Sequence, residues 1–489
     1  LHLLQAKHAS VDTQEGTLLQ TDDIDTMLKN GQPYKQWLKD NAVRIEATLV
    51  KDVAENGLNE SEVSTAMKLF QVSFEESDQV IRPLGESGQE AVGSMGDDTP
   101  MAVLSKKQRS LYDFFRQQFA QVTNPPIDPL REAIVMSLET CIGQELSVFD
   151  ETEAHAKRII LTSPVLSPVK FRTLMSLHDK GYPAKTFALS YDPNTANLQQ
   201  SIERMLDDVV TAVRSGTTLV VLSDAELNKA HLPIHALLAT GAVHHRLTDQ
   251  GLRCDANIIV ETGTARDSHH VAALIGYGAT AVYPYLSYYV LNRLIESGEL
   301  LMDYSDAYKN YQKGLDKGLL KILSKMGIST VASYRGAQLF EAVGLASEVV
   351  DLCFKGTVSR IQGATFAHLE NDQVILAKQA WNPRKTIAPG GLLKYIHGQE
   401  YHAFNPDVVV ALQKAVQSGD YSAWRDYSSL VNERPVATLR DMFKLRDGTK
   451  AIAIDDVEPL KDIVLRFDSA GMSLGALSPE AHEGLAQAM

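Results

Sequence analysis

Thr217-Thr218-Leu219-Val220-Val221-Leu222 and Asn257-Ile258-Ile259-Val260-Glu261 are the stretches that decide the fold. Both are short runs of Val, Ile and Leu without apolar–polar alternation, which is typical of strands covered on both faces. Further apolar runs predict strands at residues 158–161, 186–190, 279–283 and 330–333. Helical periodicity appears between the runs, at residues 198–213, 234–248 and 268–275. Alternating β and α units predict an α/β fold built on a parallel sheet or barrel.

The segments before this alternation show a different pattern. Residues 46–150 are predicted to be mostly helical, with apolar spacing of three to four at 46–53 and 60–74. Two stiff connectors, residues 93–100 with two glycines and 124–132 with three prolines, flank an amphipathic run at 104–122. Prolines exclude a helix interior or a central strand there. We expect this part to fix one surface against another.

The segments after the alternation contain long helices and a boundary. Helices are predicted at residues 303–326 and 359–381, and Pro- and Gly-rich sequence marks a boundary near residue 386. Two more helices are expected at 406–418 and 421–432. Residues 462–467 are then predicted to lead as a strand into a Gly-rich loop, and Ser478-Pro479 to start a helix.

Composition bounds the class of protein. The chain has 489 residues, 44% hydrophobic and 22% charged, which is typical of two to four globular domains. A net charge of −14 argues against partners that are nucleic acids or anionic membranes. No run reaches the roughly 18 apolar residues of a spanning helix. Three dispersed cysteines indicate no disulfide framework and favour the cytoplasm. Because Leu1 is neither an initiator Met nor part of a signal peptide, we expect the chain to begin after processing or inside a longer protein.

Several motifs together resemble one known family, the glutamate synthase large subunit. They run in order along essentially the whole chain and include Leu161-Thr162-Ser163-Pro164-Val165-Leu166, Val260-Glu261-Thr262-Gly263, Ser333-Tyr334-Arg335-Gly336-Ala337-Gln338, Gly398-Gln399-Glu400-Tyr401-His402 and Gly471-Met472-Ser473-Leu474-Gly475. The resemblance implies the end of an amidotransferase domain with a linker at residues 1–45. It implies a partial barrel-like central domain with a helical N-terminal part at 46–385. Linker helices and the first βα unit of an incomplete (β/α)₈ FMN barrel follow at 386–489.

The resemblance also implies a function. Family enzymes convert glutamine, 2-oxoglutarate and a reductant to two glutamates, using FMN and a 3Fe–4S cluster. This segment would connect the glutaminase and FMN sites and contribute to an ammonia tunnel. It would contact its own amidotransferase and FMN domains, bind no cofactor and be inactive alone. A small electron-donating subunit is a further partner that the family allows. The electron donor and the oligomeric state stay open.

Two sets of site residues follow from the resemblance. The tunnel is expected to be lined or gated by small neutral residues, because a buried unpaired charge would trap ammonium. That set is Met136, Ser137, Ser163, Leu166 and Ser167. The loop at the end of the last predicted strand gives the flavin-contacting candidates, Met472, Ser473, Leu474 and Gly475. No catalytic residue and no metal ligand is assigned.

Two alternatives stay open. A freestanding α/β enzyme would place its site at the strand ends near Ser190, Ser223 and Glu261, in a concave pocket lined by converging polar groups. There Glu261 would be a catalytic carboxylate, whereas a structural role would have it cap the next helix or bridge to Arg266. The second alternative is a purely structural scaffold between domains. It would have no passage.

Three weaker motifs have ordinary explanations. Neighbouring histidines, His244-His245 and His269-His270, offer at most one ligand per helix face, so no metal set is complete. Gly276-Tyr277-Gly278-Ala279-Thr280-Ala281 matches a loose dinucleotide fingerprint but is predicted to close a helix. Cys141 is expected to be a buried apolar residue in a helical stretch.

Overall fold

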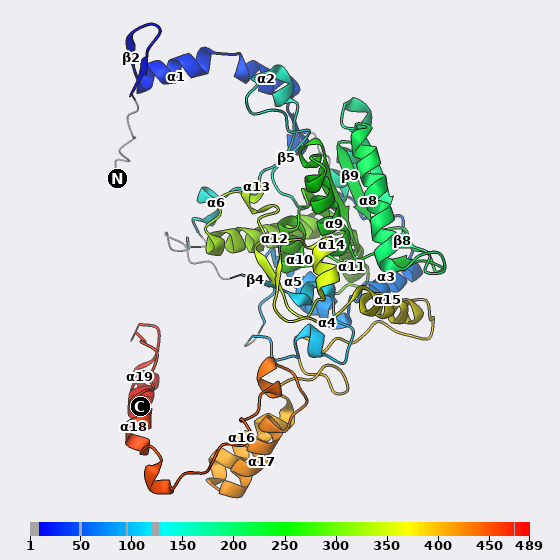
Figure 1. Cartoon of the computed structure of the whole chain (residues 1–489). Coiled ribbons are helices and arrows are strands. Elements are labelled where there is room, and N and C mark those ends of the chain that lie inside the picture. Colours follow the sequence, from blue (N-terminus) through cyan, green and yellow to red (C-terminus); the bar gives the residue numbers. More distant parts are fainter. Residues whose placement is uncertain (1–8, 48–50, 94–95, 119–126, 129, 474) are drawn as a thin grey trace. The chain divides into compact units, whose positions relative to one another are not determined.

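A parallel four-stranded sheet lies within the unit of residues up to 438 (Figure 1). The computed structural model describes residues 9–47, 51–93, 96–118, 127–128, 130–473 and 475–489. Its central strands, in spatial order β12-β11-β9-β7, are β7 (Ala184–Ala188), β9 (Leu219–Ser223), β11 (Asn257–Glu261) and β12 (Ala281–Tyr283). All neighbouring pairs are parallel, with Ile258 opposite Val220 and Val260 opposite Val282. The predicted α/β class with a parallel sheet is therefore confirmed.

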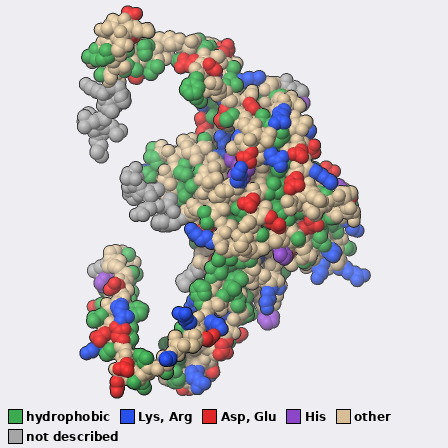
Figure 2. All heavy atoms as spheres, in the orientation of Figure 1, with side chains coloured by type: hydrophobic (Ala, Val, Ile, Leu, Met, Phe, Trp, Pro, Cys, Tyr) green, Lys and Arg blue, Asp and Glu red, His purple; other side chains and the backbone are tan. Residues whose placement is uncertain are grey.

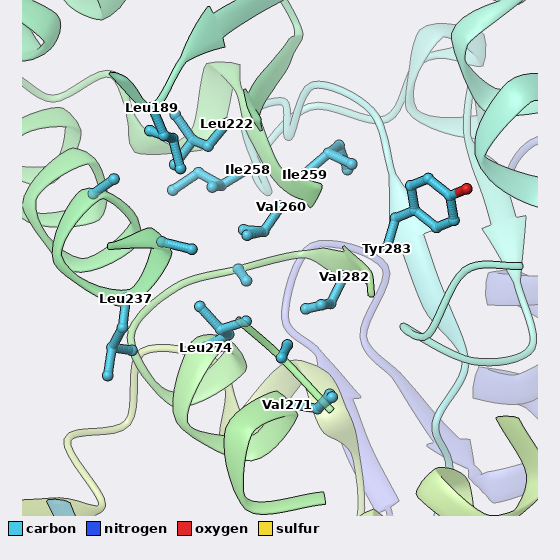
Figure 3. Packing of buried hydrophobic residues seen from close by; sticks show 14 of the residues in the cluster. Leu189, Leu222, Leu237, Ile258, Ile259, Val260, Val271, Leu274, Val282 and Tyr283 are labelled. Atoms are coloured by element: carbon cyan, nitrogen blue, oxygen red, sulfur yellow. The ribbon is translucent and has the colours of Figure 1, made fainter. Parts of the chain in front are cut away.

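The helices between these strands bury their apolar faces against the sheet. They are α8 (Leu198–Arg214), α9 (Ala236–Asp249) and α10 (Ser268–Gly276). Helix α8 begins at Asn197, which accepts from the Gln200 N–H in a capping box. Side chains of β11 meet Leu237 of α9 and Leu274 of α10 in one buried cluster (Figure 3). Helix α10 ends at Gly276, and Gly278 has a φ of +111°, so the glycine-rich motif closes a helix as predicted.

Strands that are consecutive in sequence are also neighbours in space, a winding that open sheets and barrels share. The segment before α7 (Pro168–Met175) adds one parallel bridge, from Val165 to Val282 of β12. Within the described residues the sheet remains open, and no closed barrel is present.

Two predicted strands differ from the structure. Residues 158–161 do form β6 (Ile159–Leu161), but it pairs with β3 (Val43–Arg44) and β5 (Thr140–Ile142), outside the central sheet. The strand predicted at 330–333 is instead the short helix α13 (Val331–Tyr334). Thr330 explains the difference, because its hydroxyl accepts from the Ser333 N–H and caps a helix. Cys141, expected in a helix and buried, lies exposed in β5.

The expectation that residues 46–150 are mostly helical was wrong. Most of the helix in this region lies in two stretches. The first is α3 (Glu60–Leu69), and the second runs without a gap through α4 (Phe74–Glu76), a π-helical turn (Ser77–Ile81) and α5 (Arg82–Ser87). Residues 45–47 form a single 3₁₀ turn instead of the predicted helix start, and 48–50 lie outside the described residues. The amphipathic run enters a strand, β4 (Phe115–Gln117), and is not described at 119–126. Parts of both predicted connectors, residues 94–95, 124–126 and 129, also lie outside the described residues.

The helices beyond the sheet follow the sequence pattern more closely. Helices α12 (Tyr304–Met326), α16 (Pro406–Ser418) and α17 (Tyr421–Asn432) lie where they were predicted. The helix predicted at residues 359–381 starts later than expected. It is α15 (Phe366–Ala380), and Thr365 caps it. The remaining elements are β1 (Ala9–Asp12), β2 (Thr17–Gln20), α1 (Thr21–Asn30), α2 (Tyr34–Asn41), α6 (Glu132–Val135), β8 (Ser190–Tyr191), β10 (Leu232–Pro233), α11 (Tyr285–Glu296), β13 (Phe340–Ala342), α14 (Ser347–Cys353) and β14 (Val358–Ser359).

Residues 439–489 form a second compact unit, separate from the unit of residues up to 438. It holds α18 (Leu460–Val464) and α19 (Pro479–Ala488), and Ser478 caps α19 as predicted. The strand predicted at 462–467 is not formed, because α18 and a turn occupy most of that stretch. None of the described side chains of this unit is buried. The domain limits at residues 45 and 385 remain predictions.

Candidate functional site

The carboxyl ends of the central strands bring together polar side chains from β9, β11 and β12. Ser223 Oγ donates to Glu261 Oε2 at 2.6 Å, and Tyr283 Oη donates to Glu55 Oε2 at 2.7 Å. Burial raises the pKa of Glu261, an effect that the Ser223 hydroxyl opposes. Ser190 does not join them, since it lies in β8, paired with Pro233 of β10. The structure thus unites two of the three strand-end residues predicted for a freestanding enzyme.

Glu261 has neither of the structural roles that the sequence suggested. Helix α10 is capped by Asp267, whose Oδ1 accepts from the His270 N–H. Arg266 pairs instead with Glu76, its Nε lying 2.7 Å from Glu76 Oε1. Glu261 is held by the Ser223 hydroxyl of the neighbouring strand, a contact between residues directly opposite in the parallel register.

A second, fully buried polar network lies beside these strand ends. Asp224 accepts from Thr262 Oγ1 at 2.5 Å and from the Gly263 N–H at 2.8 Å. Thr264 continues the network to the Tyr112 hydroxyl at 3.1 Å. Burial raises the pKa of Asp224 to about 7, while the hydrogen bonds from Thr262 and Gly263 act in the opposite direction. Every member has a partner within the network, so it stabilises the loops that follow β9 and β11.

The strand ends leave little room for a substrate. A cavity lined by Phe70, His235, Thr264, Arg266 and other residues has a volume of about 20 Å³, enough for about one water molecule. Burial lowers the pKa of His235 to about 3 and that of His270 to about 4, so both imidazoles are neutral near pH 7. A small-molecule pocket is typically ~300 Å³ or larger. This cavity is therefore too small for a substrate.

The predicted tunnel residues come from two segments that meet at one end of a strand pair. Strands β5 and β6 are antiparallel, with Thr140 opposite Leu161. Met136 and Ser137 precede β5, and Ser163, Leu166 and Ser167 follow β6, so both segments leave the same end of the ladder.

Their environments differ between the two segments. Ser137 is exposed and Met136 is partly buried, whereas Ser163, Leu166 and Ser167 are fully buried. Ser163 Oγ donates to Asp316 Oδ1 of α12 at 2.5 Å, and Ser167 Oγ accepts from the Lys170 N–H as the cap of α7. Burial raises the pKa of Asp316 to about 6. Sequence alone gave no signal for Asp316, which lies 153 positions from its partner.

The predicted flavin loop lies in the unit of residues 439–489. Met472 is partly exposed, Ser473 and Gly475 are exposed, and Leu474 is outside the described residues. None of the described side chains of this unit is buried, and the flavin contacts of these residues remain a prediction.

The histidine pairs find other partners. Arg253 Nε lies 3.1 Å from His244 Nδ1, and His269 Nε2 lies 3.1 Å from the carbonyl of Tyr112. Over the part of the chain that the structure describes, no group of three His, Cys, Asp or Glu side chains could hold a metal ion. None of the helices described there is long and apolar enough to cross a membrane.

Fold and site together define an α/β segment whose strand ends carry hydrogen-bonded polar side chains. Comparison with known proteins gives the family: residues 65–346 match the glutamate synthase central domain, and residues 402–489 match the conserved region in glutamate synthase. The chain belongs to the glutamate synthase family, as its motifs predicted.

Relatives match over nearly the whole chain. It is 37% identical to the glutamate synthase [NADPH] large chain of Bacillus subtilis over 98% of this chain and 31% of that protein. It is 39% identical to the ferredoxin-dependent glutamate synthase of Pyropia yezoensis, over 98% of this chain and 32% of that protein. The glutamate synthase [NADH] of Schizosaccharomyces pombe is 35% identical over 98% of this chain and 24% of that protein. The chain therefore spans about a third or less of the length of these relatives.

Proposed function

We propose that this chain is the connecting segment of a glutamate synthase that converts glutamine, 2-oxoglutarate and a reductant to two glutamates. The single observation that carries the proposal is the match to glutamate synthases over 98% of the chain. The cavity beside the strand ends supports a connecting role, because its volume of about 20 Å³ is too small for a separate substrate. The parent enzyme would use FMN and a 3Fe–4S cluster and act in the cytoplasm. Residues 472–475 would contribute one edge of its flavin site.

The segment would also form part of an ammonia tunnel between the glutaminase and synthase sites. Ammonia must stay unprotonated to act as a nucleophile, so a closed passage preserves its reactivity. The shared end of β5 and β6 supports this role, since it gathers both predicted tunnel segments at one place. Ser163 and Ser167 are buried, whereas Ser137 is exposed and Met136 is partly buried, so we assign the gating position to Met136 and Ser137.

The electron donor is proposed to dock elsewhere in the intact enzyme. Relatives named for NADPH, NADH and ferredoxin are 35–39% identical over this segment. Because these identities are so similar, we propose that this segment does not determine which electron donor the enzyme uses. A small electron-donating subunit would accordingly bind outside them.

Ser137→Trp in the full-length enzyme tests the tunnel. Ser167 is unsuitable because it is 1% exposed and caps α7, so Trp there would disrupt folding. With Ser137→Trp we expect glutamine hydrolysis to continue while glutamate formed per glutamine consumed falls several-fold. Ser147→Trp, at another exposed serine after β5, is the matched control. An unchanged ratio for Ser137→Trp would refute the gating assignment and favour the purely structural scaffold.

A further inference from the structure

One segment, just after the predicted domain boundary near residue 386, is bound by a buried carboxylate. We call residues 388–405 the strap; they lie largely between the two family matches, which end at residue 346 and begin at 402. Glu75 Oε2 accepts from the N–H groups of Gly391 at 2.8 Å, Leu392 at 2.9 Å and Leu393 at 3.2 Å. Glu75 Oε1 accepts from the Lys394 N–H at 2.8 Å. Glu75 is only 5% exposed, so four strap donors replace water around its carboxylate.

The strap sequence is built for this contact. Gly390 and Gly391 both have a φ of +109°, a region that favours glycine. A Cβ at Gly390 would lie 2.2 Å from Glu75 Cβ. The start of the strap also bonds to the backbone of α4. The Phe74 N–H donates to the Ala388 carbonyl at 2.8 Å, and the Glu75 N–H donates to the Pro389 carbonyl at 3.1 Å. A Pro-Gly-Gly stretch that would otherwise be a flexible linker is thereby held in one conformation.

The next residue of α4 connects the same turn to the central sheet. Glu76 pairs with Arg266, whose NH1 donates to the carbonyls of Gly263 and Thr264 in the loop after β11. Adjacent carboxylates on α4 therefore bind in two directions. Glu75 holds the strap, and Glu76 holds the strand-end loop.

We call the four hydrogen bonds between the Glu75 carboxylate and the amides of residues 391–394 the cradle. Two further buried contacts hold the part of the strap that follows it. Glu400 Oε2 accepts from Ser105 Oγ at 2.6 Å, and His402 Nδ1 lies 2.7 Å from Asp98 Oδ1. His402 Nε2 lies 2.9 Å from the carbonyl of Gly391, which ties this end of the strap back to the cradle. Glu400 and His402 are both buried. The strap is thus fixed along its length by side chains that precede β4.

We propose that Glu75 is a positioning residue that fixes the start of the conserved region, residues 402–438, relative to the strand ends of the central sheet, which belong to the same compact unit. The inference rests on the proposed function, because the register matters if ammonia must pass from one region to the other. Glu75 touches no reacting group. It acts through the four strap amides and, by way of Glu76, through Arg266.

Glu75→Gln in the full-length enzyme is the first test. Gln places an NH₂ group against N–H donors, so at least one cradle contact becomes repulsive. By amide hydrogen exchange, we expect residues 391–394 to exchange about tenfold or more faster. Glutamate formed per glutamine consumed should fall several-fold, while the rate of glutamine hydrolysis is unchanged. Glu86→Gln, an exposed glutamate of α5, removes the same charge and should change neither measurement.

Gly390→Ala tests the cradle from the strap side, independently of charge. Its methyl group would collide with Glu75, so we expect the same loss of amide protection and of coupling. Gly216→Ala is the control, because Gly216 has a φ of +100° but nothing within 4 Å of an added Cβ.

If amide exchange at residues 391–394 is unchanged in either variant, the proposal that Glu75 holds the strap is refuted. Faster exchange with an unchanged glutamate-to-glutamine ratio would refute the positioning role. A wild-type enzyme that forms no glutamate would refute the proposed function, and the exchange data would still decide whether Glu75 holds the strap.

Discussion

The central sheet and the unit of residues 439–489 are both rich in apolar residues, but only the sheet buries them. Every residue of β9 is buried, and the strand ends beside it are joined by hydrogen-bonded polar groups. In residues 439–489, Leu445 is 93% exposed and Ile454 is 87% exposed. Apolar and charged side chains are interspersed on the visible surface of that unit (Figure 2).

This difference shows that apolar content alone does not make a core. A strand or helix gains about 25 cal/mol for each Å² of apolar surface that it removes from water, which requires a second apolar face nearby. The central strands find that face on α9 and α10. Helices α18 and α19 have no buried residue, so their contribution to the stability of this chain should be small.

The largest contrast should come from an added charge. Val260 is 0% exposed in β11, and Val260→Asp would bury a carboxylate without a partner. We expect the free energy of unfolding to fall by about 4 kcal/mol or more. Ile454→Asp, in the exposed unit, should change it by less than about 0.5 kcal/mol. Urea unfolding of this chain, followed by circular dichroism, measures both, and equal losses would contradict the contrast.

Breaking an ion pair should give the next largest effect. Arg266→Met leaves Glu76, whose side chain is only 18% exposed, without its partner, and we expect a loss of about 3 kcal/mol. Lys444→Met removes the pair with Asp447, whose side chains are 82% and 86% exposed, and should cost less than about 0.5 kcal/mol. Thermal unfolding of each variant checks the prediction. It fails if both substitutions lower the melting temperature alike.

The smallest effect concerns pH and the buried network at Asp224. Its pKa is raised to about 7 in the folded chain, above the 3.8 of an unperturbed Asp. The folded state therefore holds a proton that the unfolded state releases, and this stabilisation is lost as pH rises from about 4 through about 7. Between pH 5 and pH 8 the wild-type chain should lose about 2 kcal/mol more than Asp224→Asn. Urea unfolding across that range tests it, and parallel pH profiles would rule out Asp224 as the source.

The sequence was informative where local pattern and tertiary packing agree. The unalternating apolar run at 257–261 predicted β11 with its observed limits, since burial on both faces requires such a run. Helix α16 was predicted at its observed limits, and in the structure Asn405 caps it with Pro406 at the first helical position, both local effects. Ser478-Pro479 predicted the start of α19 for the same reason.

Misassignments occurred where a short segment could serve two structures. Residues 330–333 and 462–467 are apolar enough for strands, but a capping Thr330 and the turn after α18 decided otherwise. Sequence pattern likewise could not show that β6 would leave the central sheet, because pairing partners are distant in the chain.

The candidate site shows the same division. Ser223 and Glu261 were recognisable as strand-end residues, yet Asp316 and the pairing of Arg266 with Glu76 carried no local signal. The stretch Pro389-Gly390-Gly391 could be predicted as a boundary. Its binding to Glu75 could not, because Glu75 lies 316 positions away from Gly391.

By itself, the sequence determined the family, the parallel α/β class and most helix starts, since motifs, apolar runs and caps are properties of neighbouring residues. Only the tertiary structure decided which carboxylates are buried, what each one binds and how much space remains at the strand ends. Those depend on groups that are distant in the chain and are brought together by packing, where loss of water makes each polar partner matter.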